Sequence, residues 1–274
     1  TYVVLLVLLT WHWYEVRRRD LPELRPASTP YITGLLVTIA VMAATAWLGD
    51  TARLVAWSVV VLGWVVLGSY GFLSRRRTLQ FFRATDALIE RLALFVIIVL
   101  GETVVGVVNG IAETPERDAL TIATGVLGLC IGFGVWWNYF DIVGVRDLRA
   151  ERTALATWFF GHLVQCGAIA ASGAAMVGLV THAHADRTPA AVAWTLGGAV
   201  ALILVLVALQ ATTVERRADE LGTRILARVF GAGAVLVLAL AWWAPAPWLL
   251  ALLVVGVLSA TWLMTFVPPT QPAD

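Results

Sequence analysis

One apolar stretch of the chain carries ionisable side chains at a spacing that places them on one side of a helix. Residues 85–109 are long enough and apolar enough to cross a bilayer, yet they include Glu90, Arg91 and Glu102. At a rise of about 1.5 Å per residue, Arg91 and Glu102 lie about 16 Å apart along the axis. Eleven residues make almost three turns, and Asn109, seven residues further, returns to this face within about 20°. The spacing predicts one polar face with Arg91, Glu102 and Asn109.

Glu102 is the candidate with the most specific chemistry. Ionisable groups at the centre of a spanning helix cost roughly 2.5–3.5 kcal/mol each and usually face the protein interior or a water-filled cavity. We expect Glu102 to bind a proton or a cation, or to contact a substrate in such a cavity. The alternative is a protonated or hydrogen-bonded acid that only packs between helices. Gly101 and Gly106 would allow another helix to approach closely.

Glu90 and Arg91 are adjacent, and adjacent helix residues point about 100° apart. They are therefore not expected to pair with each other, and each needs a partner from another helix. A guanidinium group suits a carboxylate or an anionic substrate group. In the alternative interpretation, Arg91 extends to the lipid headgroups, while Glu90 and Asp86 complement the positive end of the helix.

His162 is a further candidate, in the long apolar segment 154–180 that also holds Gln165. It lies about 13 Å from the predicted cytoplasmic end of that segment, close to the level of Glu90. An imidazole at this depth would relay protons or pair with Glu90. A histidine hydrogen-bonded between helices is the alternative.

An aromatic run, residues 136–141, closes the segment predicted at 119–140. An aromatic belt at the membrane interface accounts for its tryptophans and for Tyr139. Asn138 and Asp141 need another explanation, and Asp141 is a candidate partner for an arginine. Tryptophans near other segment ends, such as Trp13, also have the positions of interface anchors.

The sequence predicts no metal or cofactor site and no soluble enzyme. Cys130 and Cys166 lie inside apolar segments without a metal-ligand spacing, which is typical of small buried hydrophobic residues. His182, His184 and Asp186 have a spacing that would bind a metal weakly, but a solvated loop is the favoured interpretation. Phosphate-binding, esterase, zinc-protease and dinucleotide-binding motifs are absent from the sequence.

Composition places the chain among polytopic helical membrane proteins. The sequence has 274 residues, of which 60% are hydrophobic and 14% charged, and the apolar residues recur in blocks of about 20. The net charge of +1 gives no reason to expect nucleic-acid binding. We predict an all-α transmembrane bundle of about nine spans, near residues 1–14, 31–48, 54–73, 86–109, 119–140, 154–180, 189–211, 225–243 and 246–267.

Arginines alternate between the connections. Fifteen fall in alternate connections, at 15–30, 74–84, 141–153 and 212–228, three fall in the others, and Arg91 lies within a span. The positive-inside rule places the arginine-rich connections in the cytoplasm, so the C-terminus is predicted to be cytoplasmic. Because all connections are short, residues 1–267 are predicted to form a single transmembrane domain, followed by a proline-rich tail at 268–274.

Two blocks resemble the bacterial low temperature requirement protein A (LtrA) family. The first is Glu90-Arg91-x-x-Leu94-Phe95-x-Ile97-Ile98-x-Leu100-Gly101-Glu102, and the second is Trp136-Trp137-x-Tyr139-Phe140-Asp141. The family's usual first helix, of the ELFFDLVF type, is absent and is expected upstream of Thr1. Ala87 replaces a histidine that members often have, so His162 is a candidate for its role. The resemblance implies a bacterial membrane protein linked to growth in the cold, without a defined reaction, and it singles out Glu90, Arg91, Glu102 and Asp141.

These observations support three functional hypotheses. The leading one is a proton- or ion-coupled transporter of a small solute, or a channel-like protein, in the bacterial inner membrane, with a polar cavity lined by Glu90, Arg91, Glu102 and His162. The second is a non-catalytic structural or regulatory protein of envelope adaptation, whose buried charges only lock helix packing. The third is a membrane-embedded lipid enzyme, for which Glu90 with Asp141 is the one acidic pair. The expected partners are the bilayer, a proton, ion or small solute, and further copies of the chain.

Overall fold

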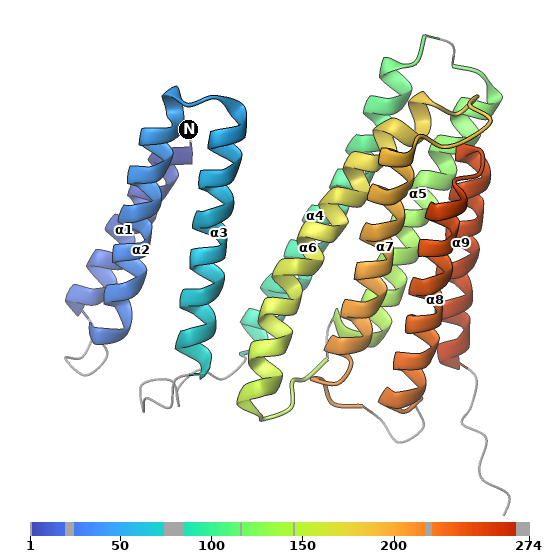
Figure 1. The fold of residues 1–274 in the computed structure, drawn as a ribbon. Helices are drawn as coiled ribbons and strands as arrows, with labels where there is room; N and C mark the ends of the chain where they lie inside the picture. Colours follow the sequence, from blue (N-terminus) through green and yellow to red (C-terminus); the bar gives the residue numbers. More distant parts are fainter. Residues whose placement is uncertain are drawn as a thin grey trace, which may run out of the picture. The chain divides into compact units, whose positions relative to one another are not determined.

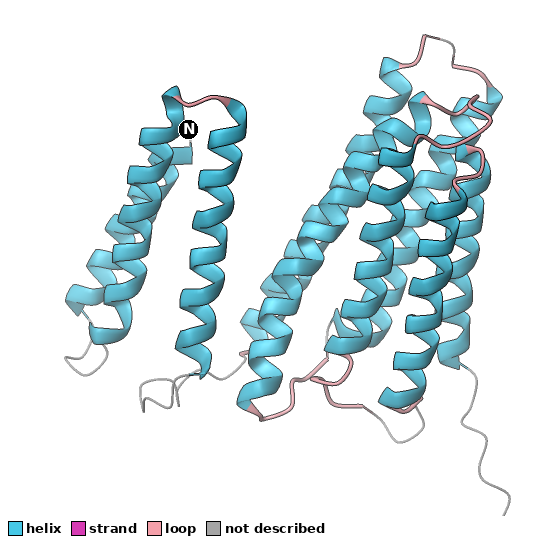
Figure 2. Cartoon of the chain, in the orientation of Figure 1, coloured by secondary structure: helices cyan, strands magenta, loops and turns pink. Residues whose placement is uncertain are grey.

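The computed structural model describes residues 2–19, 25–73, 85–115, 117–144, 146–216 and 221–266. In these ranges the chain is helical and contains no strand (Figure 2). The α-helices are α1 Tyr2–Arg19, α2 Arg25–Ala44, α3 Asp50–Leu73, α4 Asp86–Glu113, α5 Ala119–Tyr139, α6 Arg152–Thr181, α7 Ala190–Gln210, α8 Thr223–Trp243 and α9 Pro247–Leu263 (Figure 1).

The predicted all-α membrane fold is confirmed. Eight of the helices described, α2 to α9, are long and apolar enough to cross a membrane. Helix α1, predicted as a short span at residues 1–14, does not meet this criterion because it continues through charged residues to Arg19. The predicted connection 74–84 and the predicted tail 268–274 lie outside the described residues.

Residue contacts divide the chain into two compact units. Unit 1 comprises Thr1–Arg83 and holds α1 to α3, and unit 2 comprises Ala84–Asp274 and holds α4 to α9. The single transmembrane domain expected over residues 1–267 stays a prediction.

Aromatic and hydroxyl side chains connect the helices of unit 1. The ring of Trp13 in α1 stacks on that of Tyr31 in α2, with centroids 5.1 Å apart. The indole N–H of Trp64 in α3 donates to Thr38 Oγ1 in α2 over 2.9 Å. A Cβ at Gly34 would lie 3.0 Å from the Trp64 ring, so glycine leaves the room that this ring fills. Trp13, expected as an interface anchor, thus packs against a neighbouring helix, and its place at a membrane interface stays a prediction.

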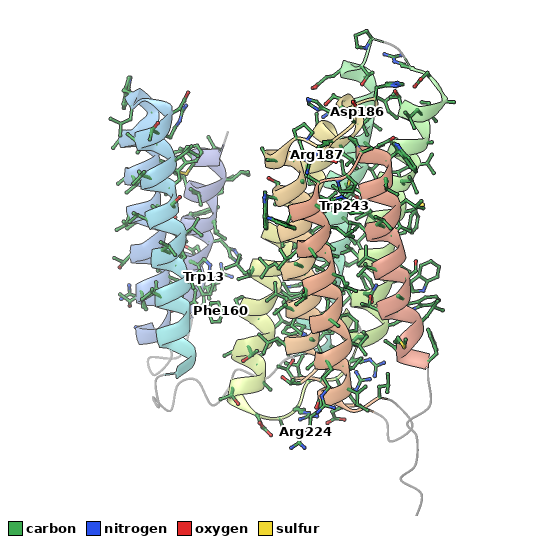
Figure 3. All side chains as sticks on the ribbon, turned by 45° about the vertical axis from the view of Figure 1, so that its right-hand side comes forward. Trp13, Phe160, Asp186, Arg187, Arg224 and Trp243 are labelled. Atoms are coloured by element: carbon green, nitrogen blue, oxygen red, sulfur yellow. The ribbon has the colours of Figure 1, made fainter. Side chains whose placement is uncertain are left out.

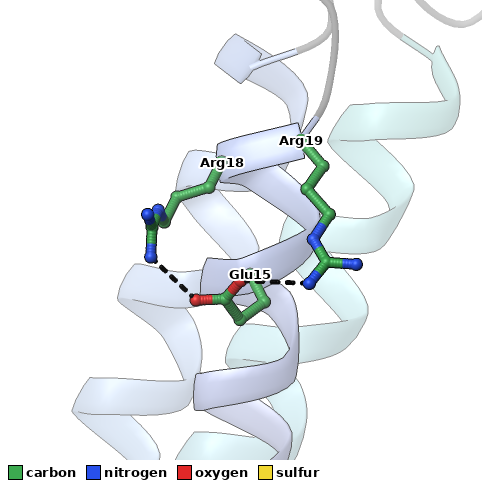
Figure 4. Close-up of polar contacts among 3 residues, drawn as sticks. All are labelled: Glu15, Arg18 and Arg19. Atoms are coloured by element: carbon green, nitrogen blue, oxygen red, sulfur yellow. Dashed lines mark hydrogen bonds and ion pairs between the residues drawn. The ribbon is translucent and has the colours of Figure 1, made fainter.

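The connection predicted at residues 15–30 is shorter than expected. Arginine is a good helix former and basic side chains suit the negative end of a helix, so α1 extends to Arg19. In its last turns Glu15 accepts from Arg18 at 3.1 Å and lies 3.7 Å from Arg19 (Figure 4). These arginines are exposed, and such surface pairs contribute only about 0–1 kcal/mol.

Helices α6 and α7 form the centre of unit 2. In their most apolar stretches 56% and 61% of residues are buried, against 28–39% for the other helices of this unit. Helix α6 packs against α4, α5 and α7, helix α7 against α8, and helix α5 against α9. Side chains projecting from α6 into the bundle therefore have the least access to the surroundings.

Glycines bring α4 and α6 into backbone contact. A Cβ at Gly106 would lie 2.0 Å from the carbonyl oxygen of Gly173, and one at Gly173 would lie 2.7 Å from the Glu102 carbonyl oxygen. Gly110, four residues after Gly106, would place a Cβ 2.7 Å from Val180 Cβ. This is the small-xxx-small arrangement of membrane helix pairs. The expected close approach occurs at Gly106, but a Cβ at Gly101 meets no described atom within 4 Å.

The arginine-rich connections of unit 2 meet at one end of the bundle. The segment after α5 and the one after α7 pair through the Arg149 N–H to the Thr213 oxygen (2.9 Å) and the Glu215 N–H to the Asp147 oxygen (2.8 Å). The end of α9 joins them, because the Trp262 indole N–H donates to the Asp141 carboxylate.

The arginine-poor connections of unit 2 meet at the opposite end. The Thr188 N–H donates to the Pro245 oxygen over 2.9 Å, and Arg187 donates to the Trp243 oxygen over 2.7 Å. Figure 3 shows Arg187 and Trp243 at this end and Arg224 at the other. The alternation read from the sequence therefore separates the connections of unit 2 correctly.

Acid is expected to weaken the arginine-poor end through Asp118. This side chain caps α5 by accepting from the Thr121 N–H over 2.9 Å, and it lies 3.1 Å from His184 Nε2. The hydrogen bonds from Thr121, followed by His184, hold the pKa of Asp118 below its ordinary value of 3.8. A carboxylate whose pKa is lower in the folded than in the unfolded protein stabilises the fold at pH values above its unfolded-state pKa. This stabilisation is lost as the pH falls through the folded-state pKa.

The test compares thermal unfolding of wild type and Asp118→Asn in detergent at about pH 7 and about pH 3. Asparagine still caps a helix, so the variant isolates the charge. We expect wild type to be the more stable at the higher pH and the difference to shrink at the lower one. An equal difference at both pH values would contradict the assignment.

Candidate functional site

A stripe of polar and aromatic side chains on α6 faces the interior of unit 2. Trp158, His162 and Gln165 are spaced by four and three residues, so they lie on one side of the helix. Their exposed fractions are 1%, 1% and 0%. The stripe is buried because this side of α6 faces α5 and α7 at the centre of the bundle.

His162 is hydrogen-bonded through both ring nitrogens. Its Nδ1 lies 2.7 Å from the carbonyl oxygen of Trp158, and its Nε2 lies 2.7 Å from the hydroxyl of Tyr139 on α5. A carbonyl oxygen only accepts, so Nδ1 carries the hydrogen, and in the neutral imidazole Nε2 accepts from the Tyr139 hydroxyl. Tyr139 is 0% exposed. In this hydrogen bond the phenol hydroxyl of Tyr139 is therefore the donor, and the titratable imidazole of His162 is the acceptor.

Gln165 meets Gln210, the last residue of α7. The Gln210 amide nitrogen donates to Gln165 Oε1 over 3.2 Å, and both side chains are 0% exposed. Gly161 makes this contact possible, because a Cβ there would lie 2.8 Å from the Gln210 amide nitrogen. The Gln210 amide therefore lies beside α6 at Gly161, the residue before His162, and its partner Gln165 follows His162 by three residues.

A second polar cluster joins α5 to α9. Asn138 donates to the Leu258 oxygen over 3.0 Å and accepts from the Thr261 hydroxyl over 3.1 Å. Asp141, in the π-helical turn Phe140–Gly144, accepts from Trp262 through its carboxylate and from Arg146 through its backbone oxygen. Arg146 is thus an arginine beside Asp141, and the contact described between them runs to the backbone oxygen of Asp141.

Four of the predicted residues lie on exposed faces of α4. Arg91, Glu102 and Asn109, predicted to share one side of the helix, are all exposed, whereas Glu102 was expected to face the protein interior or a cavity. Glu90 is exposed as well and borders a groove of about 400 Å³, lined by Asp86, Ile89, Glu90, Ala93, Leu94, Ile97, Phe140 and Asp147.

The family comparison is consistent with the two sequence blocks. The chain matches the model of the bacterial low temperature requirement A protein (LtrA) family over residues 1–262. The chain belongs to the LtrA family. Comparisons with curated proteins and with solved structures found no match.

The two blocks have different environments in this LtrA protein. The first block lies within α4, where the Glu102 side chain is exposed although its backbone lies against Gly173 of α6. The second ends α5, where Trp136 and Trp137 are exposed while Tyr139 is buried. The sequence interpretation placed Tyr139 in an interface belt, and the structure corrects this because the hydroxyl finds its partner in the interior.

The six predicted site residues of the LtrA protein do not gather in unit 2. His162 lies in the interior, Asp141 lies at the end of α5, and the remaining four lie on exposed faces of α4: Glu90, Arg91, Glu102 and Asn109. A pair between His162 and Glu90 does not form, since both ring nitrogens of His162 have other partners. The alternative considered for His162, a hydrogen bond between helices, is the geometry observed.

Sequence reasoning did not identify Tyr139, Trp158 or Gln210 as site residues of the LtrA protein. For Trp158 the signal was the spacing to His162 and Gln165, which puts all three on one face. For Gln210 the signal was a lone amide at the end of an otherwise apolar helix. For Tyr139 the sequence offers no distinguishing signal, because a tyrosine near a helix end fits an interface belt equally well.

Proposed function

We propose that this LtrA protein is a proton- or ion-coupled transporter of a small solute, or a channel-like protein, in the cytoplasmic membrane of a bacterium. The observation that carries the proposal is the buried His162–Tyr139 hydrogen bond inside a bundle of helices apolar enough to cross a membrane. Histidine is the side chain whose charge changes most readily near neutral pH. Ionisable residues within spans often mark proton and ion pathways.

In this proposal His162 handles the proton inside unit 2, and α4 supplies a second polar element. Glu102 binds a proton or a cation, and Arg91 binds an anionic group of the solute. The exposed positions of both residues support access from outside unit 2. The arginine-rich connections and the C-terminus face the cytoplasm under the positive-inside rule. The family description supports a role in growth at low temperature.

Proton flux in liposomes tests this function. Full-length protein would be reconstituted with a pH-sensitive dye inside the vesicles, and a pH gradient would be applied with and without candidate solutes. We expect wild type to carry flux and His162→Gln to lose it, because glutamine keeps hydrogen-bonding groups but does not titrate. Glu102→Gln tests the α4 element in the same assay and is expected to abolish proton-coupled flux.

His182→Gln is the matched control, since His182 lies in an exposed connection and should leave the flux unchanged. Flux retained in His162→Gln would remove that residue from the mechanism, and flux retained in Glu102→Gln would remove the carboxylate. If wild type shows no flux with any solute, transport is wrong.

A structural or regulatory role in the envelope is the second candidate. The observation that favours it is the glycine-mediated contact of α4 with α6, which places the Glu102 backbone against Gly173. Under this hypothesis, Glu102→Gln lowers thermal stability in detergent but still restores growth in the cold to a deletion strain. A loss of that rescue by a stably folded variant would favour transport instead.

A further inference from the structure

Three buried polar atoms on side chains of the α6 stripe and of Gln210 have no hydrogen-bond partner among the described residues. They are the indole nitrogen Nε1 of Trp158, the amide nitrogen of Gln165 and the amide oxygen of Gln210. All three side chains are at least 99% buried. An unpaired buried polar group costs about 1–3 kcal/mol, so three of them in one region require an explanation.

Rotating the amide groups of Gln165 and Gln210 does not supply the missing hydrogen-bond partners. The contact between Gln165 and Gln210 uses one N–H and one oxygen in both arrangements that form a hydrogen bond, the one described and the one with both amides turned. One amide nitrogen and one amide oxygen then remain unpaired in either arrangement. The indole of Trp158 has a single N–H and cannot turn into an acceptor. The unpaired set is therefore always two donors and one acceptor.

We propose that ordered water occupies this region and binds the Gln165–Gln210 amide pair and the Trp158 N–H. Water both accepts and donates, and buried waters typically make about three hydrogen bonds to such groups. An anion would meet the unpaired amide oxygen without a basic side chain in this set, and a cation would meet the two N–H groups. The mixed set of two donors and one acceptor selects water over either ion.

The bound water borders the His162–Tyr139 pair. The Trp158 and His162 rings are 4.4 Å apart, and the Gln210 amide lies against Gly161, the residue before His162. The side chains of the proposed site thus come from α6 positions on both sides of His162 and from the end of α7. The site rests on the unpaired atoms and not on the proposed transport function, so it can be present in a protein that carries no flux.

X-ray radiolytic labelling of the wild-type protein in lipid nanodiscs tests the site. Radicals formed from bound water oxidise neighbouring side chains that bulk solvent does not reach. After correction for intrinsic reactivity, we expect Trp158 to be labelled at least about tenfold faster than Met176, a fully buried residue of the same helix that contacts glycines. Equal, slow labelling of the two residues would overturn the proposal.

The double variant Gln165→Met, Gln210→Met removes both amides while keeping side-chain length. We expect labelling of Trp158 to fall at least about fivefold and labelling of the exposed Trp242 to stay the same. An unchanged rate at Trp158 would show that the amides do not hold the water. If the double variant does not fold, the wild-type comparison of Trp158 with Met176 decides by itself.

Discussion

Replacing Gly106 with alanine is expected to separate α4 from α6 and to destabilise unit 2 by about 3 kcal/mol or more, at the upper end of overpacking costs. The new Cβ would lie 2.0 Å from the Gly173 carbonyl oxygen and 3.1 Å from Met176 Cβ. The first of these is a backbone atom in a helix, so a side-chain rotation cannot relieve the clash. The measurement is unfolding of the purified protein in mixed detergent micelles.

Gly101→Ala is the matched control on the same helix. A Cβ at Gly101 meets no described atom within 4 Å. Alanine is the better helix former by roughly 0.5–1 kcal/mol, so this variant should unfold at the same or a higher denaturant concentration than wild type. Equal losses at Gly101 and Gly106 would mean that glycine is required along α4 for another reason than contact with α6.

The second large effect is expected for Tyr139→Phe. The change keeps the ring and removes only the hydroxyl, which leaves His162 Nε2 as a buried acceptor without its partner. A buried polar group left unpaired costs about 1–3 kcal/mol, and we expect a loss of stability in this range. Tyr14→Phe on α1 is the control, because Tyr14 is 51% exposed and its change should stay within about 0.5 kcal/mol.

A double-mutant cycle separates the hydrogen bond from the packing of the two rings. His162→Leu alone leaves the Tyr139 hydroxyl unpaired, whereas the double variant with Tyr139→Phe removes both polar groups. The double variant should therefore lose less stability than the sum of the singles, by about 0.5–3 kcal/mol. Strict additivity would contradict a hydrogen bond between these side chains.

Local patterns were enough to predict the elements of the fold. The apolar segments found in the sequence correspond to the helices α1 to α9, and Pro189 comes directly before the first residue of α7. The shared face of Arg91, Glu102 and Asn109 follows from helix geometry alone, and the three residues are exposed together. The C-terminal end of α1 was predicted less accurately, because helix formation continues into arginine-rich sequence.

The neighbours of each helix were not predictable by the same reasoning. A spanning helix is apolar on most sides, and lipid is as apolar as a leucine side chain, so hydrophobicity does not indicate which face meets another helix. The contact of Gly106 with Gly173 depends on both helices, and its only local trace is the four-residue spacing to Gly110. The environment of Tyr139 depends likewise on α6 lying beside α5.

The sequence by itself determined the membrane class, the family, the helical segments of the described residues and the alternation of arginine between connections. Each of these depends on composition or on residues near one another in the chain. The tertiary structure alone decided that His162 pairs with Tyr139, that Gln165 meets Gln210 and that Asp141 meets Trp262. These pairs join residues 23 to 121 positions apart, and only the packing of specific helix faces brings them together.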